Sequence, residues 1–247
     1  MGAWDFALLA VVTLQVTAIA YFPRPRWKAL ALSLPFPFTT IALAQAQPIN
    51  ATHILALGLL LLYFHGIRLL HLRLPIVLAL AIGLAGYITL SRLLLQVAAT
   101  TPLPFWLVAL VIAALALTLY FLQPSRPEPD HRTPLPIYYK LPTIGLIVGL
   151  LLLVKDSLQG FATLFPIIGV VGAYEARKGL WAVCRQVPVL VAGMTAMLAA
   201  TYLAQETLGL AKGLLVGWVV YLAILWPLTV RLWTREALAL DQQNAST

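Results

Sequence analysis

Long, continuous apolar runs restrict this chain more than any other feature of its sequence. Of the 247 residues, 62% are hydrophobic and only 10% are charged, whereas soluble domains carry about a quarter charged residues. Several runs reach the roughly 20 apolar residues that a helix needs to cross a bilayer. Because the runs do not alternate with polar residues, they predict membrane helices and exclude barrel strands, the other structure that satisfies its backbone inside lipid.

The apolar runs predict an all-α, polytopic membrane helix bundle with about nine transmembrane helices. We expect these helices at residues 4–22, 29–47, 52–70, 74–95, 103–123, 138–156, 160–178, 186–204 and 210–232. Residues 124–137 are rich in proline and too polar to span, so they predict a cytoplasmic linker between residues 1–123 and 138–232. Residues 233–247 form a cytoplasmic tail, and we expect disorder from Asp241 onward.

Lysine and arginine are distributed unevenly between alternate loops, which predicts the orientation of the bundle. With the N-terminus outside, the cytoplasmic side receives Arg24, Arg26, Lys28, Arg68, Arg73, Arg126, Arg132, Lys140, Arg177, Lys178, Arg185, Arg231 and Arg235, and the other side or the helix ends receive Arg92, Lys155 and Lys212. This positive-inside bias predicts a cytoplasmic C-terminus. It also accounts for the net charge of +8, so we expect no nucleic-acid partner. Residues 6–20 follow no basic segment, so they predict a first membrane helix and not a signal peptide.

Two parts of the sequence match each other, which predicts an internal duplication. The matches join Trp106–Ile112 to Trp218–Ile224 at an offset of 112, Tyr63 to Tyr174 at 111, and Pro75 to Pro188 at 113. Residues 29–123 and 138–232 would then be two four-helix units, with the first helix extra. Since four is even, the units would be parallel, as in several transporters. Chance matching in an apolar sequence is the alternative explanation.

The second part also carries short motifs of a known family. An apolar run follows Lys140, residues 160–166 read Gly-Phe-Ala-Thr-Leu-Phe-Pro, and a basic loop spans residues 177–185. Over residues 140–232 the chain resembles the GlpM family of bacterial inner-membrane proteins, which are short four-helix chains with a similar Phe-Pro pair and loop. Leu55 stands where Pro166 would align in the first half. The resemblance implies a bacterial inner-membrane location and names no substrate.

Polar residues within or beside the apolar runs are the candidates for solute binding, because ionisable groups inside a membrane are costly. The candidates are Gln45, Asn50, His53, Arg68, Lys155, Asp156, Pro166, Tyr174 and Glu175. Pro166 is the strongest pointer to an internal site, because a proline frees backbone groups that must find partners or line a cavity.

Each candidate also has a structural explanation. Lys155 and Asp156 could extend to water at a helix end, and Asn50 and His53 could belong to an ordinary turn. Glu175 could form an interfacial ion pair with Arg68 or a neighbouring lysine, and Pro166 could form a simple kink.

The sequence contains none of the common phosphate-loop, zinc-protease or serine-hydrolase motifs. We therefore expect no cofactor, no metal and no catalytic residue, although Glu175 with His65 could form an acid–base pair. Cys184 is the only cysteine, so the chain cannot form an internal disulfide. We expect it to lie in a basic loop as an unreactive thiol.

Three functions remain open, and one of them is a membrane-embedded enzyme that acts on a lipid substrate through Glu175 and His65. The duplication and Pro166 predict a transporter of a small molecule or a lipid-linked solute. The alternative is a non-catalytic subunit or assembly factor of a cell-envelope complex, because Gly209, Gly213 and Gly217 form a small-residue stripe suited to helix contacts, including those of a homodimer. Membrane lipid is an expected partner in all three cases.

Overall fold

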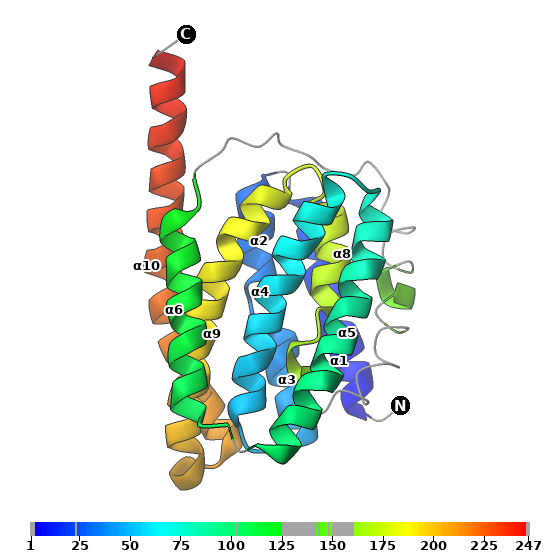
Figure 1. The fold of residues 1–247 in the computed structure, drawn as a ribbon, viewed down its shortest axis with the longest axis vertical. Coiled ribbons are helices and arrows are strands. Elements are labelled where there is room, and N and C mark those ends of the chain that lie inside the picture. Colours follow the sequence, from blue (N-terminus) through cyan, green and yellow to red (C-terminus); the bar gives the residue numbers. More distant parts are fainter. Residues whose placement is uncertain are drawn as a thin grey trace.

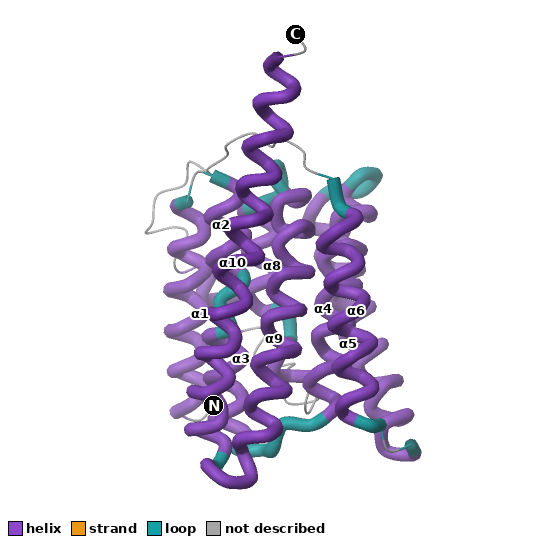
Figure 2. The backbone as a smooth tube through the Cα atoms, turned by 90° about the vertical axis from the view of Figure 1, so that its left-hand side faces the viewer, coloured by secondary structure: helices purple, strands orange, loops and turns teal. Residues whose placement is uncertain are grey.

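The computed structural model describes residues 3–22, 24–101, 103–124 and 161–245, with a few positions between 142 and 149. All regular elements of this described part are helices, as the sequence predicts (Figures 1 and 2). The helices are α1 (Ala3–Tyr21), α2 (Pro25–Leu32), α3 (Phe36–Gln45), α4 (Ala51–His71), α5 (Ile76–Thr100), α6 (Phe105–Leu122), α8 (Ile167–Glu175), α9 (Leu180–Leu208) and α10 (Leu210–Ala245).

Length and composition make the chain a membrane protein. Among the described residues, six helical segments are long and apolar enough to cross a bilayer, namely α2 with α3, α4, α5, α6, α9 and α10. Two shorter apolar helices, Phe6–Tyr21 and Phe161–Glu175, accompany them. The predicted helix at 138–156 and the predicted linker lie almost entirely outside the described residues, so the count of nine stays a prediction.

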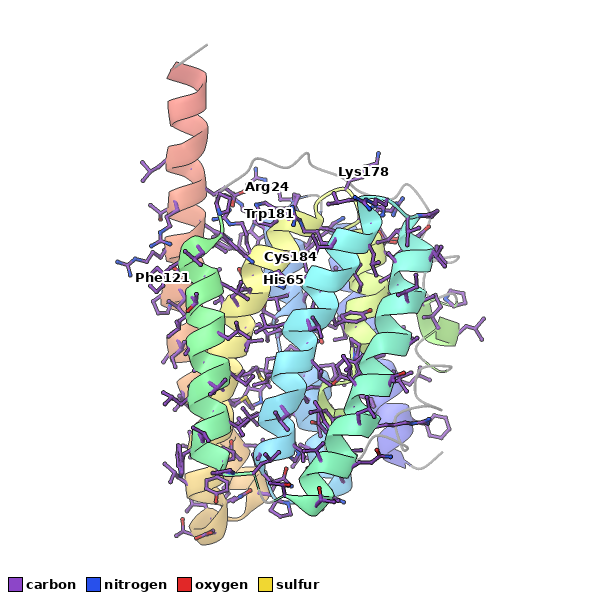
Figure 3. All side chains as sticks on the ribbon, in the orientation of Figure 1. Arg24, His65, Phe121, Lys178, Trp181 and Cys184 are labelled. Atoms are coloured by element: carbon purple, nitrogen blue, oxygen red, sulfur yellow. The ribbon has the colours of Figure 1, made fainter. Side chains whose placement is uncertain are left out.

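The helices run alternately up and down a single bundle. Figure 3 places Arg24 and Lys178 at the same end, which we call the basic end. The helices α2, α3, α5 and α9 run away from the basic end, whereas α4, α6, α8 and α10 run toward it (Figure 1). Arg24 and Lys178 therefore lie on one side, as the charge pattern predicts. Which side of the membrane this is stays a prediction.

Two predicted helices are broken inside the bundle. The expected helix at 29–47 ends at Leu32 and starts again at Phe36. The expected helix at 160–178 begins as a short 3₁₀ turn over 161–164, and α8 starts only after Pro166. Proline lacks a backbone N–H and clashes with the preceding turn, so the prolines at 35, 37 and 166 explain both breaks. The predicted kink at Pro166 is in fact an interruption of the helix.

The prediction of a disordered C-terminal tail is wrong. Helix α10 continues to Ala245 and projects beyond the rest of the bundle at the basic end (Figure 1). Residues 235–243 consist almost entirely of strong helix formers such as Ala, Leu, Glu, Gln and Arg. Local propensity therefore carries the helix past the membrane-spanning part.

The small-residue stripe of α10 packs inside the chain. A Cβ atom on Gly217 would lie 2.9 Å from the backbone oxygen of Met197 in α9 and would also collide with Thr201. In α5, a Cβ on Gly83 would lie 2.9 Å from Cγ1 of Ile67 in α4. These glycines allow close approach of helix pairs within the protein, so Gly217 serves internal packing.

We expect Gly217→Ala to lower the free energy of unfolding by about 1–3 kcal/mol, because backbone atoms of α9 would have to move. Thermal unfolding in mild detergent measures this change. Gly86→Ala is the matched control, since nothing lies within 4 Å of its added Cβ. Equal stability of the two variants would contradict the close packing of α9 and α10.

Candidate functional site

Side chains from other helices hold the break between α2 and α3. The Nε2 of Gln15 in α1 donates to the carbonyl oxygens of Ala31, at 2.7 Å, and Leu34, at 3.0 Å. The hydroxyl of Tyr221 in α10 donates to the carbonyl oxygen of Ser33. Carbonyls freed by a break inside a membrane need such partners, so this break is a stabilised part of the fold.

The break before α8 is held in a similar way. The hydroxyl of Tyr87 in α5 donates to the carbonyl oxygen of Phe161 at 3.2 Å. The Tyr87 ring also packs edge-on against Phe165, with 5.8 Å between the ring centroids. Each break therefore receives a tyrosine hydroxyl at a carbonyl that precedes its Phe-Pro pair.

Each break carries a Phe-Pro pair, and the two broken helices run in opposite directions. Phe36-Pro37 and Phe165-Pro166 are the only Phe-Pro pairs within the two interrupted helices. The stabilising tyrosines lie in matching Gly-x-x-x-Tyr motifs, Gly83 to Tyr87 and Gly217 to Tyr221, which are 134 residues apart. The helix of the first break runs away from the basic end, whereas α8 runs toward it (Figure 1).

The residues that contact these two glycines are also 134 positions apart in the sequence. The atoms nearest a Cβ on Gly83 belong to Ile67 and Tyr63, whereas those nearest a Cβ on Gly217 belong to Thr201 and Met197. Residues 63 and 67 become 197 and 201 at this spacing. The pair α4–α5 therefore packs like the pair α9–α10, with the helix directions reversed.

The predicted parallel matches join residues in unlike surroundings. Tyr63 is buried in α4, while Tyr174 is 39% exposed near the basic end. Pro75 precedes α5 as its N-cap, whereas Pro188 lies inside α9. The described contacts thus favour a correspondence other than the predicted offset of 112, and they do not support the parallel arrangement.

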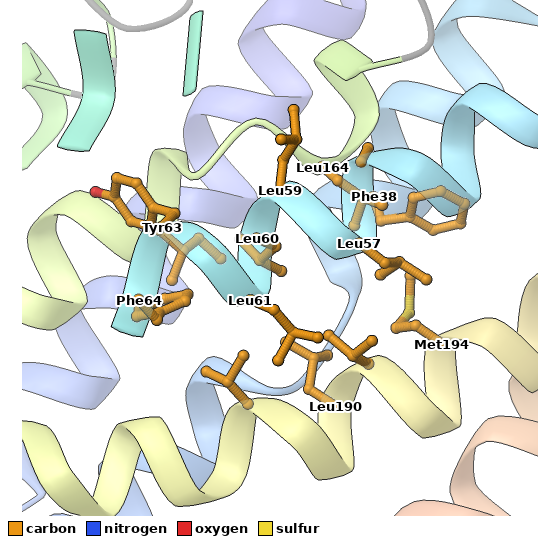
Figure 4. Close-up of a cluster of buried hydrophobic side chains, with 14 of the residues drawn as sticks. Phe38, Leu57, Leu59, Leu60, Leu61, Tyr63, Phe64, Leu164, Leu190 and Met194 are labelled. Atoms are coloured by element: carbon orange, nitrogen blue, oxygen red, sulfur yellow. The ribbon is translucent and has the colours of Figure 1, made fainter. Parts of the chain in front are cut away.

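A cavity of about 70 Å³ lies where the two breaks meet. Its walls come from both breaks, α4 and α9, and consist of Leu32, Leu34, Pro35, Pro37, Phe38, Leu60, Phe64, Thr163, Leu164, Phe165, Pro166, Ile168, Gly169, Leu190 and Met194. Figure 4 shows part of this apolar region, in which leucines of α4 face Leu190 and Met194 of α9. Among these described side chains, the hydroxyl of Thr163 is the only polar group.

Residues from both sets of helices line this cavity. Pro37 and Pro166 line it from the two breaks, and Leu60 and Met194 line it from α4 and α9. Leu60 and Met194 are again 134 residues apart. The cavity therefore lies between α2 to α4 on one side and α8 and α9 on the other.

A layer of buried polar groups lies between the cavity and the basic end. Lys28, only 2% exposed, comes one helical turn before the cavity residue Leu32, and its Nζ donates to the carbonyl oxygen of Glu175 at 3.0 Å. Gln186 comes one turn before Leu190 and donates to Thr229 at 2.9 Å. A buried lysine at the last carbonyls of α8 compensates the negative end of that helix.

The buried layer includes two residues that the sequence predicts in loops. Lys28 and Arg185 lie inside α2 and α9, because these helices begin at Pro25 and Leu180, several residues earlier than expected. Arg185 is 3% exposed, and its guanidinium lies 3.9 Å from a carboxylate oxygen of Glu236 in α10. The expected basic loop is therefore shorter than predicted.

Cys184 also lies inside α9 and not in the loop that the sequence predicts. It is buried, as expected of an unreactive thiol, and its Sγ donates to the carbonyl oxygen of Phe64 at 3.4 Å.

Asn50 and His53 form the N-terminal cap of α4. The Oδ1 of Asn50 accepts from the Thr52 backbone N–H at 3.0 Å, and Nδ1 of His53 accepts from the Asn50 backbone N–H at 3.2 Å. This reciprocal capping satisfies backbone donors at the helix start. The two residues therefore have the structural role, and the structure does not bring them to the cavity.

We expect Asn50→Ala to destabilise the fold by about 1 kcal/mol, the usual cost of losing an N-cap. Solute movement through the bundle should stay unchanged once the protein is folded. Thermal unfolding and a flux assay on the same preparation check both parts. Gln47→Ala, at an exposed position of the same loop, is the control, and an Asn50→Ala variant of full stability but reduced flux would contradict the structural role.

Near the basic end, Arg68 and His65 have partners other than Glu175. The guanidinium of Arg68 lies over the ring of Trp181, 4.1 Å from its centroid. The Nε2 of His65 lies 2.6 Å from Nε2 of Gln123 (Figure 3 labels His65 and Trp181). The considered pairs of Glu175 with Arg68 and with His65 are therefore not formed among the described contacts.

The remaining predicted site residues are Tyr174, Gln45, Lys155, Asp156 and Pro166. The guanidinium of Arg177 lies over the Tyr174 ring, 4.7 Å from the ring centroid. Tyr174 does not line the cavity. Gln45 ends α3. Lys155 and Asp156 lie outside the described residues. Among the seven candidates that the structure describes, Pro166 is the one that lines the cavity.

Tyr63 carries a buried hydroxyl beside the second break. The residue is 3% exposed, and its hydroxyl has no hydrogen-bond partner among the described residues. Its ring packs against Tyr87, with 6.4 Å between the centroids. An unpaired buried hydroxyl costs free energy.

We therefore expect Tyr63→Phe to raise the free energy of unfolding by about 1 kcal/mol, because it removes an unpaired group and keeps the ring. Tyr87→Phe, which removes a paired hydroxyl, should lower it by a similar amount. Thermal unfolding of both variants tests this difference in sign. A loss of stability in Tyr63→Phe would show that its hydroxyl has a partner.

The site thus combines two broken helices, a cavity between them and a buried polar layer toward the basic end. Within the described ranges, no group of three His, Cys, Asp or Glu residues could hold a metal ion. Comparisons with known protein families, with curated proteins and with solved structures give no match.

Proposed function

We propose that the protein is a membrane transporter built from two inverted repeats. The first repeat comprises α1 to α5, the second contains α8, α9 and α10, and α6 connects them. The observation that carries this proposal is the cavity between two oppositely directed helix breaks, with walls that include the corresponding residues Leu60 and Met194. Inverted repeats with broken helices and a binding site at their interface are typical of secondary transporters.

Contacts between the two proposed repeats lie toward both ends of the bundle. Toward the basic end, Trp27 of α2 packs edge-on against Trp233 of α10, with 4.9 Å between the ring centroids. At the opposite end, the Gln205 side chain accepts from the backbone N–H of Ile49 at 2.8 Å and donates to the carbonyl oxygen of Ile49 at 3.2 Å. Opening one set of contacts while the other stays closed would expose the cavity to one side at a time.

The lining of the cavity indicates what kind of solute it would take. Ligand sites are mostly apolar with a few placed polar groups, and here the lining offers leucines, phenylalanines and methionine with the hydroxyl of Thr163. We infer a small molecule or lipid-linked solute that presents an apolar group to the cavity. The bacterial inner-membrane location and the relation to the GlpM family are part of this proposal.

Membrane vesicles with and without the protein test transport directly. They are incubated with a cell extract, and mass spectrometry compares the compounds retained inside. We expect at least one amphiphilic compound to accumulate only in vesicles that contain the protein. Identical contents in both vesicle types would count against a transporter.

The alternative function is a non-catalytic subunit of an envelope complex, and the projecting end of α10 favours it, since this helix leaves the bundle (Figure 1). Purification in mild detergent distinguishes the two. A second protein at fixed stoichiometry, together with no protein-dependent uptake, would support the subunit.

A further inference from the structure

The two tyrosine hydrogen bonds lie on opposite sides of the Phe-Pro pairs that interrupt the two helices. Ser33 precedes Phe36-Pro37 in a chain that runs away from the basic end, so the Tyr221 bond lies on the basic side of that break. Phe161 precedes Phe165-Pro166 in a chain that runs toward the basic end, so the Tyr87 bond lies on the opposite side. The inverted relation of the two halves produces this placement.

Each bond also joins one half of the protein to the other. Tyr221 belongs to α10 and holds the broken helix of the first half, whereas Tyr87 belongs to α5 and holds the broken helix of the second half. Both tyrosines are buried. Aromatic contacts follow the same pattern, since Trp218 of α10 packs on Phe36 at 5.3 Å and Tyr87 packs on Phe165 at 5.8 Å between ring centroids.

We propose that Tyr87 and Tyr221 are paired positioning residues that set the balance between the two open states of the transporter. This inference rests on the proposed function. Separation of the halves at the basic end breaks the Tyr221 bond, and separation at the other end breaks the Tyr87 bond. Loss of the Tyr221 hydroxyl therefore favours opening toward the basic end, and loss of the Tyr87 hydroxyl favours opening toward the opposite end.

Pulsed electron paramagnetic resonance between spin labels tests the inference on the full chain in lipid nanodiscs. Labels at Arg73 and Lys178 report on the basic end, and labels at Gln47 and Lys212 report on the other end; all four positions are exposed. Each pair of labels is measured in the wild type, Tyr87→Phe and Tyr221→Phe, in a background that carries Cys184→Ser.

We expect the two variants to shift the ratio of open to closed distances in opposite directions, each by roughly threefold to tenfold, the factor that one hydrogen bond supplies. Tyr63→Phe is the control and should leave the ratio unchanged, because its hydroxyl has no partner among the described residues.

Shifts in the same direction, or no shift in either variant, would overturn the paired role of the tyrosines. If the tyrosine variants fail in this way but the wild type shows two label distances at each end, the proposed transport function still stands. A single fixed distance at both ends in the wild type would overturn both the tyrosine roles and the alternating mechanism.

Discussion

Replacing Met194 with tryptophan is expected to reduce protein-dependent solute uptake at least tenfold. Met194 is buried and lines the cavity of about 70 Å³, as does Leu60. The larger indole would occupy the space that the solute needs, at a packing cost of about 1–3 kcal/mol. Uptake into proteoliposomes, normalised to the amount of folded protein, measures the effect.

Two further variants make this result interpretable. Leu60→Trp fills the same cavity from the other half and should have the same effect. Leu115→Trp adds an indole to the exposed face of α6 and should leave uptake unchanged. If both cavity variants fold and transport at the wild-type rate, the cavity is not the solute site.

Replacing Lys28 with alanine is expected to destabilise the protein by about 3 kcal/mol or more. The change leaves a space where the buried lysine side chain lies and removes the donor to the Glu175 carbonyl oxygen. Cavity formation and an unsatisfied buried acceptor each cost about 1–3 kcal/mol or more. Thermal or denaturant unfolding in detergent measures the loss.

Lys28→Met separates these two causes. Methionine fills most of the space but cannot donate a hydrogen bond, so we expect a smaller loss of about 1–2 kcal/mol. Lys212→Ala, at an exposed position at the other end of α10, serves as the control and should leave stability unchanged. If Lys28→Ala matched this control, the buried polar layer would have no structural role.

The membrane character and most helix positions could be predicted from the sequence, because both depend on local properties. The apolar runs gave the starts of α4 and α10 to within a residue. The starts of α2 and α9 were missed because Lys28 and Arg185 are charged, and a charged residue near an apolar run normally indicates a loop. Their burial depends on partners in other helices, which no local pattern reveals.

The site was only partly predictable. Proline chemistry pointed to Pro166, which lies at a helix break beside the cavity, since a proline that interrupts a helix leaves backbone groups to satisfy. The sequence left Asn50 and His53 open between a binding turn and an ordinary turn, and the structure shows their capping bonds, which depend on backbone geometry that composition does not reveal. Tyr87 and Tyr221 were missed because a tyrosine in an apolar run attracts no attention on composition alone.

The relation between the two halves illustrates a limit of matching apolar sequences. The match of Trp106 with Trp218 rests on residue identity, whereas their surroundings differ, since Trp106 is 51% exposed and Trp218 donates to Thr39. The repeated Gly-x-x-x-Tyr and Phe-Pro motifs were present in the sequence. The opposite helix directions are what lead us to propose that these motifs are related by inversion.

Accessibility of the cavity from both sides of the membrane tests the central claim most directly. The variant Thr163→Cys, in a background with Cys184→Ser, places a single thiol on the cavity wall. A membrane-impermeant thiol reagent is applied to right-side-out and to inside-out vesicles, with Leu115→Cys as the lipid-facing control. Our account predicts modification of residue 163 from both sides and none at residue 115. Modification of residue 163 from one side only, or from neither side, would contradict it.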